Sequence, residues 1–239
     1  MAALDEQLLK IVNASGFPLQ IGLRRTINQS KIDHGWSVDV EEHHWRHPRS
    51  GAEGYIDLVI EHESLFLRLI VECKRPTDAK WIFLTPKGSR PSSQVLSAFA
   101  ATKGGGGRDL TGWCDLAIEP ASPESAFCVL QGQSDRDRPM LERITDSLLP
   151  SVEALAFEEL AIPGYYCGGL KHIYVPLVVT TATLYTVSFD PAAVDLEVGQ
   201  LPVSSANFTP VPFARFRKAL ATSEQLRIRA KIKSSIFLA

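Results

Sequence analysis

The chain has 239 residues, enough for one large domain or two small ones, and 45% of them are hydrophobic, so it can bury a proper core. Charged residues make up 22%, near the average for soluble proteins, and no long apolar run predicts a transmembrane helix. The start, MAALDEQLLK, is acidic where a signal peptide needs basic residues. The four cysteines show neither CxxC nor zinc-ribbon spacing. These features favour a cytoplasmic protein with reduced thiols and no membrane partner.

The first elements along the chain are a helix and a strand. Residues 3–15 carry apolar side chains at helical spacing and are followed by Gly16, which predicts an amphipathic helix. Glu6 lies opposite the apolar stripe of this helix, so we expect it to face solvent. Residues 19–34 are ambiguous. Residues 36–41 alternate between apolar and polar side chains, as a half-buried strand does.

A cluster of acids and histidines follows that strand: Glu41, Glu42, His43, His44 and His47. Imidazole and carboxylate groups suit zinc, but this spacing brings ligands together on a helix better than on a strand. No second pair of ligands at zinc spacing appears elsewhere in the sequence. A loop of solvated or substrate-facing residues is therefore the preferred interpretation.

The next segment predicts a β-hairpin with charged residues inside apolar strands. Residues 55–61 and 66–74 are rich in β-branched and aromatic side chains, and a proline stops the second strand. Asp57, Glu72 and Lys74 interrupt this apolar pattern. A charge inside such a strand needs a partner, a metal ion or solvent. An edge-strand salt bridge on a solvated face is the simplest alternative to a functional site.

Strand geometry decides whether these three side chains can meet. Side chains alternate between the faces of a strand, so Glu72 and Lys74 share one face. A hairpin loop of two or four residues places Asp57 on that same face, whereas a three-residue loop places it on the other. Two facing carboxylates repel each other unless a cation lies between them, and Mg²⁺ is commonly held by one or two carboxylates plus water and phosphate oxygens. A lysine beside the metal could hold or help to deprotonate the attacking water and stabilise the phosphorane charge.

Asp57 and the triplet Glu72-Cys73-Lys74, which closes the following strand, resemble the PD-(D/E)XK, or restriction-endonuclease-like, nuclease superfamily. Ile56 stands where the motif name has proline. The resemblance implies a metal-dependent phosphodiesterase acting on nucleic acid, with Asp57, Glu72 and Lys74 as catalytic residues. It implies Mg²⁺ or Mn²⁺ as the cofactor, held by Asp57 and Glu72. The third ligand would be Glu41 or Glu42, of which Glu42 is preferred.

The resemblance also implies a fold. It predicts an α/β protein whose restriction-endonuclease-like mixed β-sheet is flanked by helices and followed by a C-terminal α/β extension. It covers roughly residues 1–135, so the extension would comprise residues 136–239 and complete the sheet, and the two parts could form one continuous domain.

The rest of the chain gives weaker patterns. Residues 77–88 and 190–212 read as irregular, and the four glycines at 104–107 follow a helix pattern, unlike a phosphate-binding loop. We expect helices over residues 92–103, 137–160 (interrupted near Pro150) and 213–220. We expect strands over residues 113–119, 125–132, 173–180 and 183–189, and a basic strand or helix over residues 226–237.

The charge is unevenly distributed, although the net charge of −2 does not by itself indicate nucleic-acid binding. Residues 209–239 contain seven basic side chains and one acidic side chain, which predicts a basic surface near the C-terminus. The candidate nucleic-acid contacts are Arg75, beside the catalytic lysine, and Arg215, Arg217 and Lys218. A solvated tail or helix face explains the C-terminal residues equally well.

Two classes of function are consistent with these patterns. The first is a metal-dependent nuclease. DNA is preferred as its substrate because most of the superfamily acts on DNA, and defence against foreign DNA is a role suggested by analogy. The second is a non-catalytic nucleic-acid-binding or scaffolding subunit with a nuclease-like fold. A homodimer, or a partner subunit of a larger system, would suit either function, and nothing in the sequence demands it.

Overall fold

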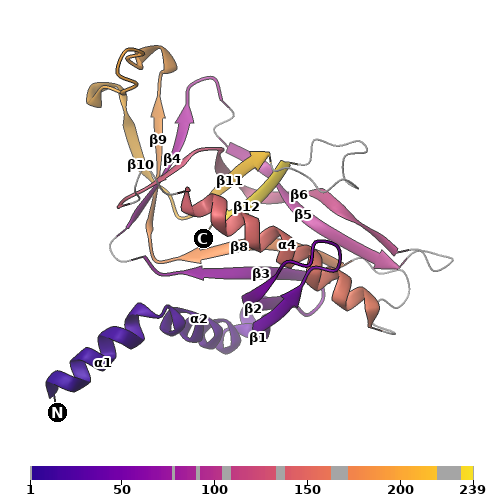
Figure 1. Ribbon diagram of the computed structural model, residues 1–239. Coiled ribbons are helices and arrows are strands. Elements are labelled where there is room, and N and C mark those ends of the chain that lie inside the picture. The colour runs from indigo at the N-terminus through magenta and orange to yellow at the C-terminus, as the bar shows by residue number, and fades with distance from the viewer. Residues whose placement is uncertain are drawn as a thin grey trace. The chain divides into compact units, whose positions relative to one another are not determined.

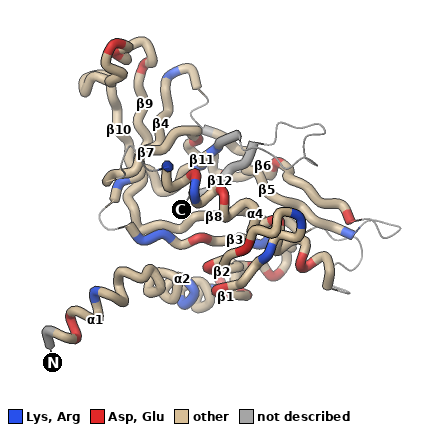
Figure 2. The backbone as a smooth tube through the Cα atoms, viewed as in Figure 1, with Lys and Arg blue, Asp and Glu red and all other residues tan. Residues whose placement is uncertain are grey.

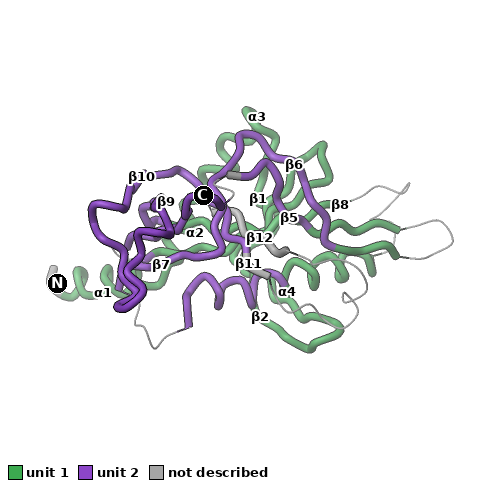
Figure 3. The backbone as a smooth tube through the Cα atoms, turned by 90° about the horizontal axis from the view of Figure 1, so that it is seen from above, with its two compact units in different colours: residues 1–75, 99–112, 150–180 green, residues 76–98, 113–149, 181–239 purple. Residues whose placement is uncertain are grey.

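The computed structural model describes residues 2–76, 79–89, 92–103, 109–132, 138–162, 172–219 and 233–238. The chain is mixed α/β and divides into two compact units (Figure 3). Unit 1 comprises residues 1–75, 99–112 and 150–180, and unit 2 comprises residues 76–98, 113–149 and 181–239. Both units take residues from before and after position 135, and the division into a core of 1–135 and an extension of 136–239 stays a prediction.

Unit 1 is a mixed sheet with helices (Figure 1). Its strands lie in the order β1, β2, β3, β8 and the end of β5; β3 and β8 are parallel, and every other neighbouring pair is antiparallel. The unit contains part or all of α1 (Ala2–Ala14), α2 (Phe17–Gln29), α3 (Lys31–His34), β1 (Trp36–Arg46), β2 (Glu53–His62), β3 (Leu67–Lys74), β5 (Ser92–Lys103), β6 (Asp109–Ser125), α4 (Met140–Ala161) and β8 (His172–Thr180).

The apolar runs of the hairpin form the core of unit 1. Leu58, Val59, Ile70 and Val71 are fully buried, as expected of strands that are covered on both faces. The loop between β2 and β3 has four residues, because His62 pairs with Leu67. The predicted hairpin is therefore confirmed, and its loop has one of the even lengths that place Asp57 and Glu72 on the same face. The helix expected over residues 3–15 is also confirmed, and Gly16, at φ 85°, separates it from α2.

Unit 2 is built from short strands. One group has the order β10, β9, β4, β7, with β4 and β9 parallel. In a second group, β11 pairs in parallel with β6 and antiparallel with β12. The bounds are β4 (Lys80–Pro86), β7 (Cys128–Leu130), β9 (Thr183–Phe189), β10 (Asn207–Pro210), β11 (Ala214–Ala219) and β12 (Lys233–Leu238), with short 3₁₀ turns at Pro191–Ala193 and Val203–Ser205.

Several predicted elements are wrong in type. Residues 92–103 form β5 instead of a helix, and residues 213–220 contain β11 instead of a helix. The segment from Leu96 to Phe99 is buried at every position, so burial in a sheet overrides the local pattern that indicated a helix. The loop expected over residues 77–88 contains β4, and α4 runs through Pro150 without interruption.

Other predicted elements are confirmed with changes. The strand expected at residues 36–41 extends to Arg46, so the loop expected for the acid and histidine cluster is wrong for residues 41–44, which belong to β1. The strands expected at residues 173–180 and 183–189 are β8 and β9, and they pair with β3 and β4. The glycines at 104–107 and residues 220–232 lie outside the described residues. Within the part of the chain that the structure describes, no helix is long and apolar enough to cross a membrane.

Candidate metal and catalytic site

Asp57 and Glu72 lie opposite each other at the end of the paired region of β2 and β3 in unit 1. Leu58 and Val71 are the last registered pair, and Asp57 and Glu72 are the next residues along their strands. The Asp57 carboxylate accepts a hydrogen bond from the backbone N–H of Cys73 at 2.6 Å. This bond holds the Asp57 side chain against β3, so the two carboxylates share one face of the sheet.

Lys74 completes this group. Its Nζ atom lies 2.5 Å from Oε1 of Glu72, and the two residues share a face because they are two apart on a strand. The side chain of Glu72 is 17% exposed and that of Lys74 is 34% exposed, so both can reach a molecule at the surface. Acidic and basic positions lie next to each other at this end of β3 (Figure 2). The structure therefore brings together the three residues that the sequence singled out as catalytic.

Glu42 joins the same group through Gln20 of α2. Glu42 falls opposite Asp57, because its neighbours in β1 pair with the neighbours of Asp57 in β2. The Nε2 group of Gln20, which is buried, donates to Oε1 of Glu42 and to the carbonyl oxygen of Asp57, each at 2.8 Å. Glu42 adopts a φ of 52°, a left-handed conformation that is uncommon for residues other than glycine.

The electrostatics of the site favour a bound cation. Burial, followed by the charge of Glu72, raises the pKa of Asp57 from 3.8 to about 6, and Glu42 adds to this effect. The Cys73 N–H and Lys74 act in the opposite direction but do not cancel it. The same burial and the same carboxylates raise the pKa of the Cys73 thiol to about 12. A divalent cation would relieve this concentration of negative charge, so the residues present fit a hard metal ion.

The donor set is small. Among the described residues, no three His, Cys, Asp or Glu side chains are already gathered closely enough to hold a metal ion. Asp57 and Glu72 face each other across β2 and β3, and Glu42 lies opposite Asp57 on the neighbouring strand β1. A magnesium ion suits such a set, because it is commonly held by one or two carboxylates and completes its shell with water and phosphate oxygens.

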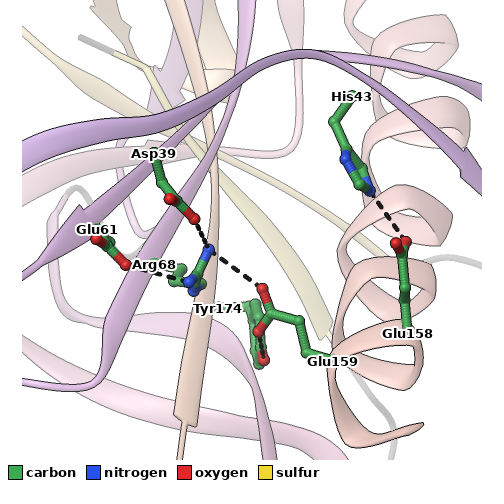
Figure 4. A network of polar contacts seen from close by, with 7 residues as sticks. All are labelled: Asp39, His43, Glu61, Arg68, Glu158, Glu159 and Tyr174. Carbon is green, nitrogen blue, oxygen red and sulfur yellow. Dashed lines mark hydrogen bonds and ion pairs between the residues drawn. The ribbon is translucent and has the colours of Figure 1, made fainter. Parts of the chain in front are cut away.

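The other acid and histidine residues of β1 have separate partners. Glu41 pairs with Arg24 at 2.5 Å, and the ring of His44 contacts Tyr55. His43 lies 3.0 Å from Glu158 of α4 (Figure 4), and His47 lies 3.1 Å from Glu153. These histidines contact different partners, so the structure gives no support to a zinc site in this cluster.

The candidate nucleic-acid contacts have different surroundings. Arg75 is exposed and donates to the carbonyl oxygen of Asn13 at the end of α1. In unit 2, Arg215 is fully buried and forms an ion pair with Glu124, which also pairs with Arg217 at 3.1 Å. The buried Arg215 side chain has no surface with which to contact a phosphate, so the role predicted for it needs correction. The side chain of Lys218 lies outside the described residues.

Two features of unit 1 did not stand out in the sequence. Gln20 sits in a segment whose structure was ambiguous, and the only signal was a polar residue between the apolar Leu19 and Ile21. Arg68 is buried and lies within 3.1 Å of three carboxylates, those of Asp39, Glu61 and Glu159 (Figure 4). A charged residue inside the apolar strand β3 was the signal for Arg68.

Comparison of the chain with protein-family models, curated proteins and solved structures gives no match.

Proposed function

We propose that this protein is a metal-dependent nuclease that hydrolyses phosphodiester bonds of nucleic acid. The observation that carries the proposal is the placement of Asp57 opposite Glu72, with the Lys74 ammonium group 2.5 Å from Glu72. Two carboxylates and a lysine at one partly exposed point are the groups that this chemistry needs. The raised pKa of Asp57 supports the proposal, because burial and then the charge of Glu72 disfavour the ionised carboxylate, and a bound cation would stabilise it.

Asp57 and Glu72 would hold the metal ion, and Glu42 would supply a third carboxylate, directly or through water. When bound, Mg²⁺ or Mn²⁺ would lower the pKa of a coordinated water and place positive charge beside the phosphate oxygens. Gln20 would keep Glu42 and the β2 backbone at Asp57 in place through its two hydrogen bonds. The Cys73 N–H would orient the Asp57 carboxylate, leaving its other oxygen available as a ligand.

Lys74 would act on the reacting groups themselves. Its ammonium group can hold the attacking water by a hydrogen bond and can stabilise the negative charge that develops on the phosphorane. The ion pair with Glu72 keeps the lysine beside the carboxylates. Arg75, the next residue, is exposed and would contact a neighbouring phosphate of the backbone.

A restriction-endonuclease-like fold is part of the same proposal. Its support is the mixed sheet of unit 1, in which the acids lie on consecutive strands and the Glu-x-Lys triplet ends β3. The remaining parts of the proposal rest only on the resemblance and the sequence. They are DNA as the substrate, a cytoplasmic location, a role in defence, and assembly as a homodimer or as a subunit of a larger system.

A second candidate is a non-catalytic nucleic-acid-binding or scaffolding subunit. One observation favours it: in the described ranges, no three potential ligands are gathered into a ready metal site. Cleavage assays with Mg²⁺ or Mn²⁺ on supercoiled, linear and single-stranded DNA and on RNA separate the two candidates. The nuclease predicts metal-dependent cutting by the wild type that is lost in Lys74→Met, whereas the binding subunit predicts binding without cutting.

A further inference from the structure

A polar groove of about 590 Å³ lies between α2 and β1 in unit 1. Its lining includes the aliphatic residues Ile21, Val38 and Val40 and the polar residues Arg25, Asn28 and Gln29. We propose that this groove binds a single-stranded segment of nucleic acid beside the scissile phosphate. The inference rests on the proposed function, because it assigns the class of substrate taken by the same site.

The groove adjoins the candidate metal site through one face of α2. Gln20, Arg24 and Asn28 are spaced one helical turn apart, so they lie along one face of the helix. Gln20 bonds Glu42 at the metal site, Arg24 pairs with Glu41, and Asn28 accepts a backbone N–H of β1 at 2.8 Å. These contacts hold α2 against the sheet. Arg24, Asn28 and Glu41 also line the groove, so the groove begins next to the carboxylates of the candidate metal site.

The charges of the groove leave one cation available for phosphate. Glu41 pairs with Arg24 at 2.5 Å, and Asp39 lies 2.7 Å from Arg68, a cation that it shares with Glu61 and Glu159. Arg25 is exposed and forms no ion pair with any residue that the structure describes. A guanidinium group in this position offers a planar pair of donors that matches the oxygens of a phosphate.

The remaining lining suits a base and sugar better than a duplex. A volume of about 590 Å³ is that of a small-molecule site and accommodates a nucleotide unit. The amides of Asn28 and Gln29 can bond the edges of a base, and the aliphatic part of the lining can cover its apolar face. In a duplex the base faces are stacked inside, so only an unpaired nucleotide can use the aliphatic part of the groove.

Fluorescence anisotropy with a labelled single strand of about 12 nucleotides, and with a blunt duplex of equal length, tests this inference in EDTA, where cleavage is absent. We expect the wild type to bind the single strand more tightly than the duplex. Arg25→Ala should weaken single-strand binding on the order of tenfold and lower the slope of log affinity against log salt by about 0.7. Arg46→Ala, which removes the same charge from an exposed position on β1, is the matched control and should change neither quantity.

A second variant leaves the charges unchanged. Gln29→Trp places a bulky side chain at an exposed helix position that lines the groove, so it should block the single strand and leave the fold intact. Equal single-strand affinities of the wild type, Arg25→Ala and Gln29→Trp would overturn the inference, as would a wild type that prefers the duplex. Metal-dependent cutting of duplex without single-strand binding would overturn the inference and retain the nuclease. Single-strand binding at the groove, with neither cutting nor Mn²⁺ binding by the wild type, would support the inference and reject the nuclease.

Discussion

Arg68 and Glu159 are buried partners that connect β3 to α4 within unit 1, with Nη1 of Arg68 3.1 Å from Oε1 of Glu159 (Figure 4). The same guanidinium group lies 2.7 Å from Asp39 and 3.1 Å from Glu61, and the hydroxyl of Tyr174 donates to Glu159. Arg68 therefore holds together three strands and a helix of the unit that carries the candidate site. By strand alternation, Arg68 lies on the same face of β3 as Glu72, four residues further along.

Removing Arg68 should destabilise the fold strongly. Arg68→Met leaves three carboxylates without their shared cation, and Glu159 is almost fully buried, so we expect the free energy of unfolding to fall by about 3 kcal/mol. Urea denaturation at neutral pH measures this change. Arg46→Met, at an exposed position, should change the stability by less than about 0.5 kcal/mol. Equal stabilities of the two variants would show that the network contributes little.

Asp57 should make stability depend on pH. Its pKa is raised from 3.8 to about 6, so the folded protein retains this proton to higher pH than the unfolded chain. The stabilising contribution is full below about pH 4 and is lost as the pH rises through about 6. At neutral pH, Asp57→Asn should therefore raise the free energy of unfolding by about 1–2 kcal/mol, allowing for the partial exposure of the carboxyl.

Urea denaturation of the wild type and of Asp57→Asn between about pH 4 and pH 8 checks this prediction. The difference between the two proteins should vanish towards the acidic end. Mn²⁺ at neutral pH should raise the melting temperature of the wild type and leave that of Asp57→Asn unchanged, because the ligand is gone. A stabilising effect of the substitution that is independent of pH would contradict the assigned pKa.

Gln20 should control metal affinity by holding Glu42 in position. Gln20→Leu keeps the size of the side chain and removes both 2.8 Å hydrogen bonds, so we expect the affinity for Mn²⁺ to fall about tenfold. Isothermal titration calorimetry on protein freed of metal measures the affinity. Gln29→Leu, on the same helix and exposed, is the control and should bind Mn²⁺ like the wild type. Unchanged affinity in Gln20→Leu would remove Glu42 from the metal site.

Cys73 should be chemically inert although it sits between two functional residues. Its pKa is raised to about 12 by burial and by Asp57 and Glu72, so little thiolate exists near neutral pH. Iodoacetamide at about pH 8 should modify the exposed Cys114 at least about a hundredfold faster than Cys73, as measured by peptide mass spectrometry. Comparable rates at the two cysteines would mean that the carboxylates do not surround the thiol.

The sequence predicted secondary structure correctly where the local residue pattern and the burial in the folded protein favour the same type of element. The hairpin strands are rich in β-branched residues, so the hairpin could be predicted from the sequence. The meeting of Asp57 and Glu72 depended on the loop length, which the structure gives as four residues. Residues 92–103 show the opposite case, because the spacing of their apolar residues indicates a helix locally while the position in a sheet requires a strand. Sequence spacing alone contains no information about that burial.

Parts of the site could not be predicted because they depend on pairings between distant segments. The contact of Gln20 with Glu42 joins α2 to β1, and the left-handed φ of Glu42 is a property of the folded strand. Arg215 was misleading for a related reason. It counts as a positive charge in the sequence, but it is fully buried in unit 2, where it pairs with Glu124.

The most direct test of the nuclease is the cleavage of nucleic acid by the wild type and by Lys74→Met. The assay would follow supercoiled plasmid, linear duplex, single-stranded DNA and RNA with Mg²⁺, Mn²⁺ or EDTA, with Lys10→Met as the control for loss of an exposed lysine. We predict cutting that requires the metal, survives in Lys10→Met and falls at least about a hundredfold in Lys74→Met. No cutting of any substrate, together with no Mn²⁺ binding to the wild type, would contradict the proposed nuclease.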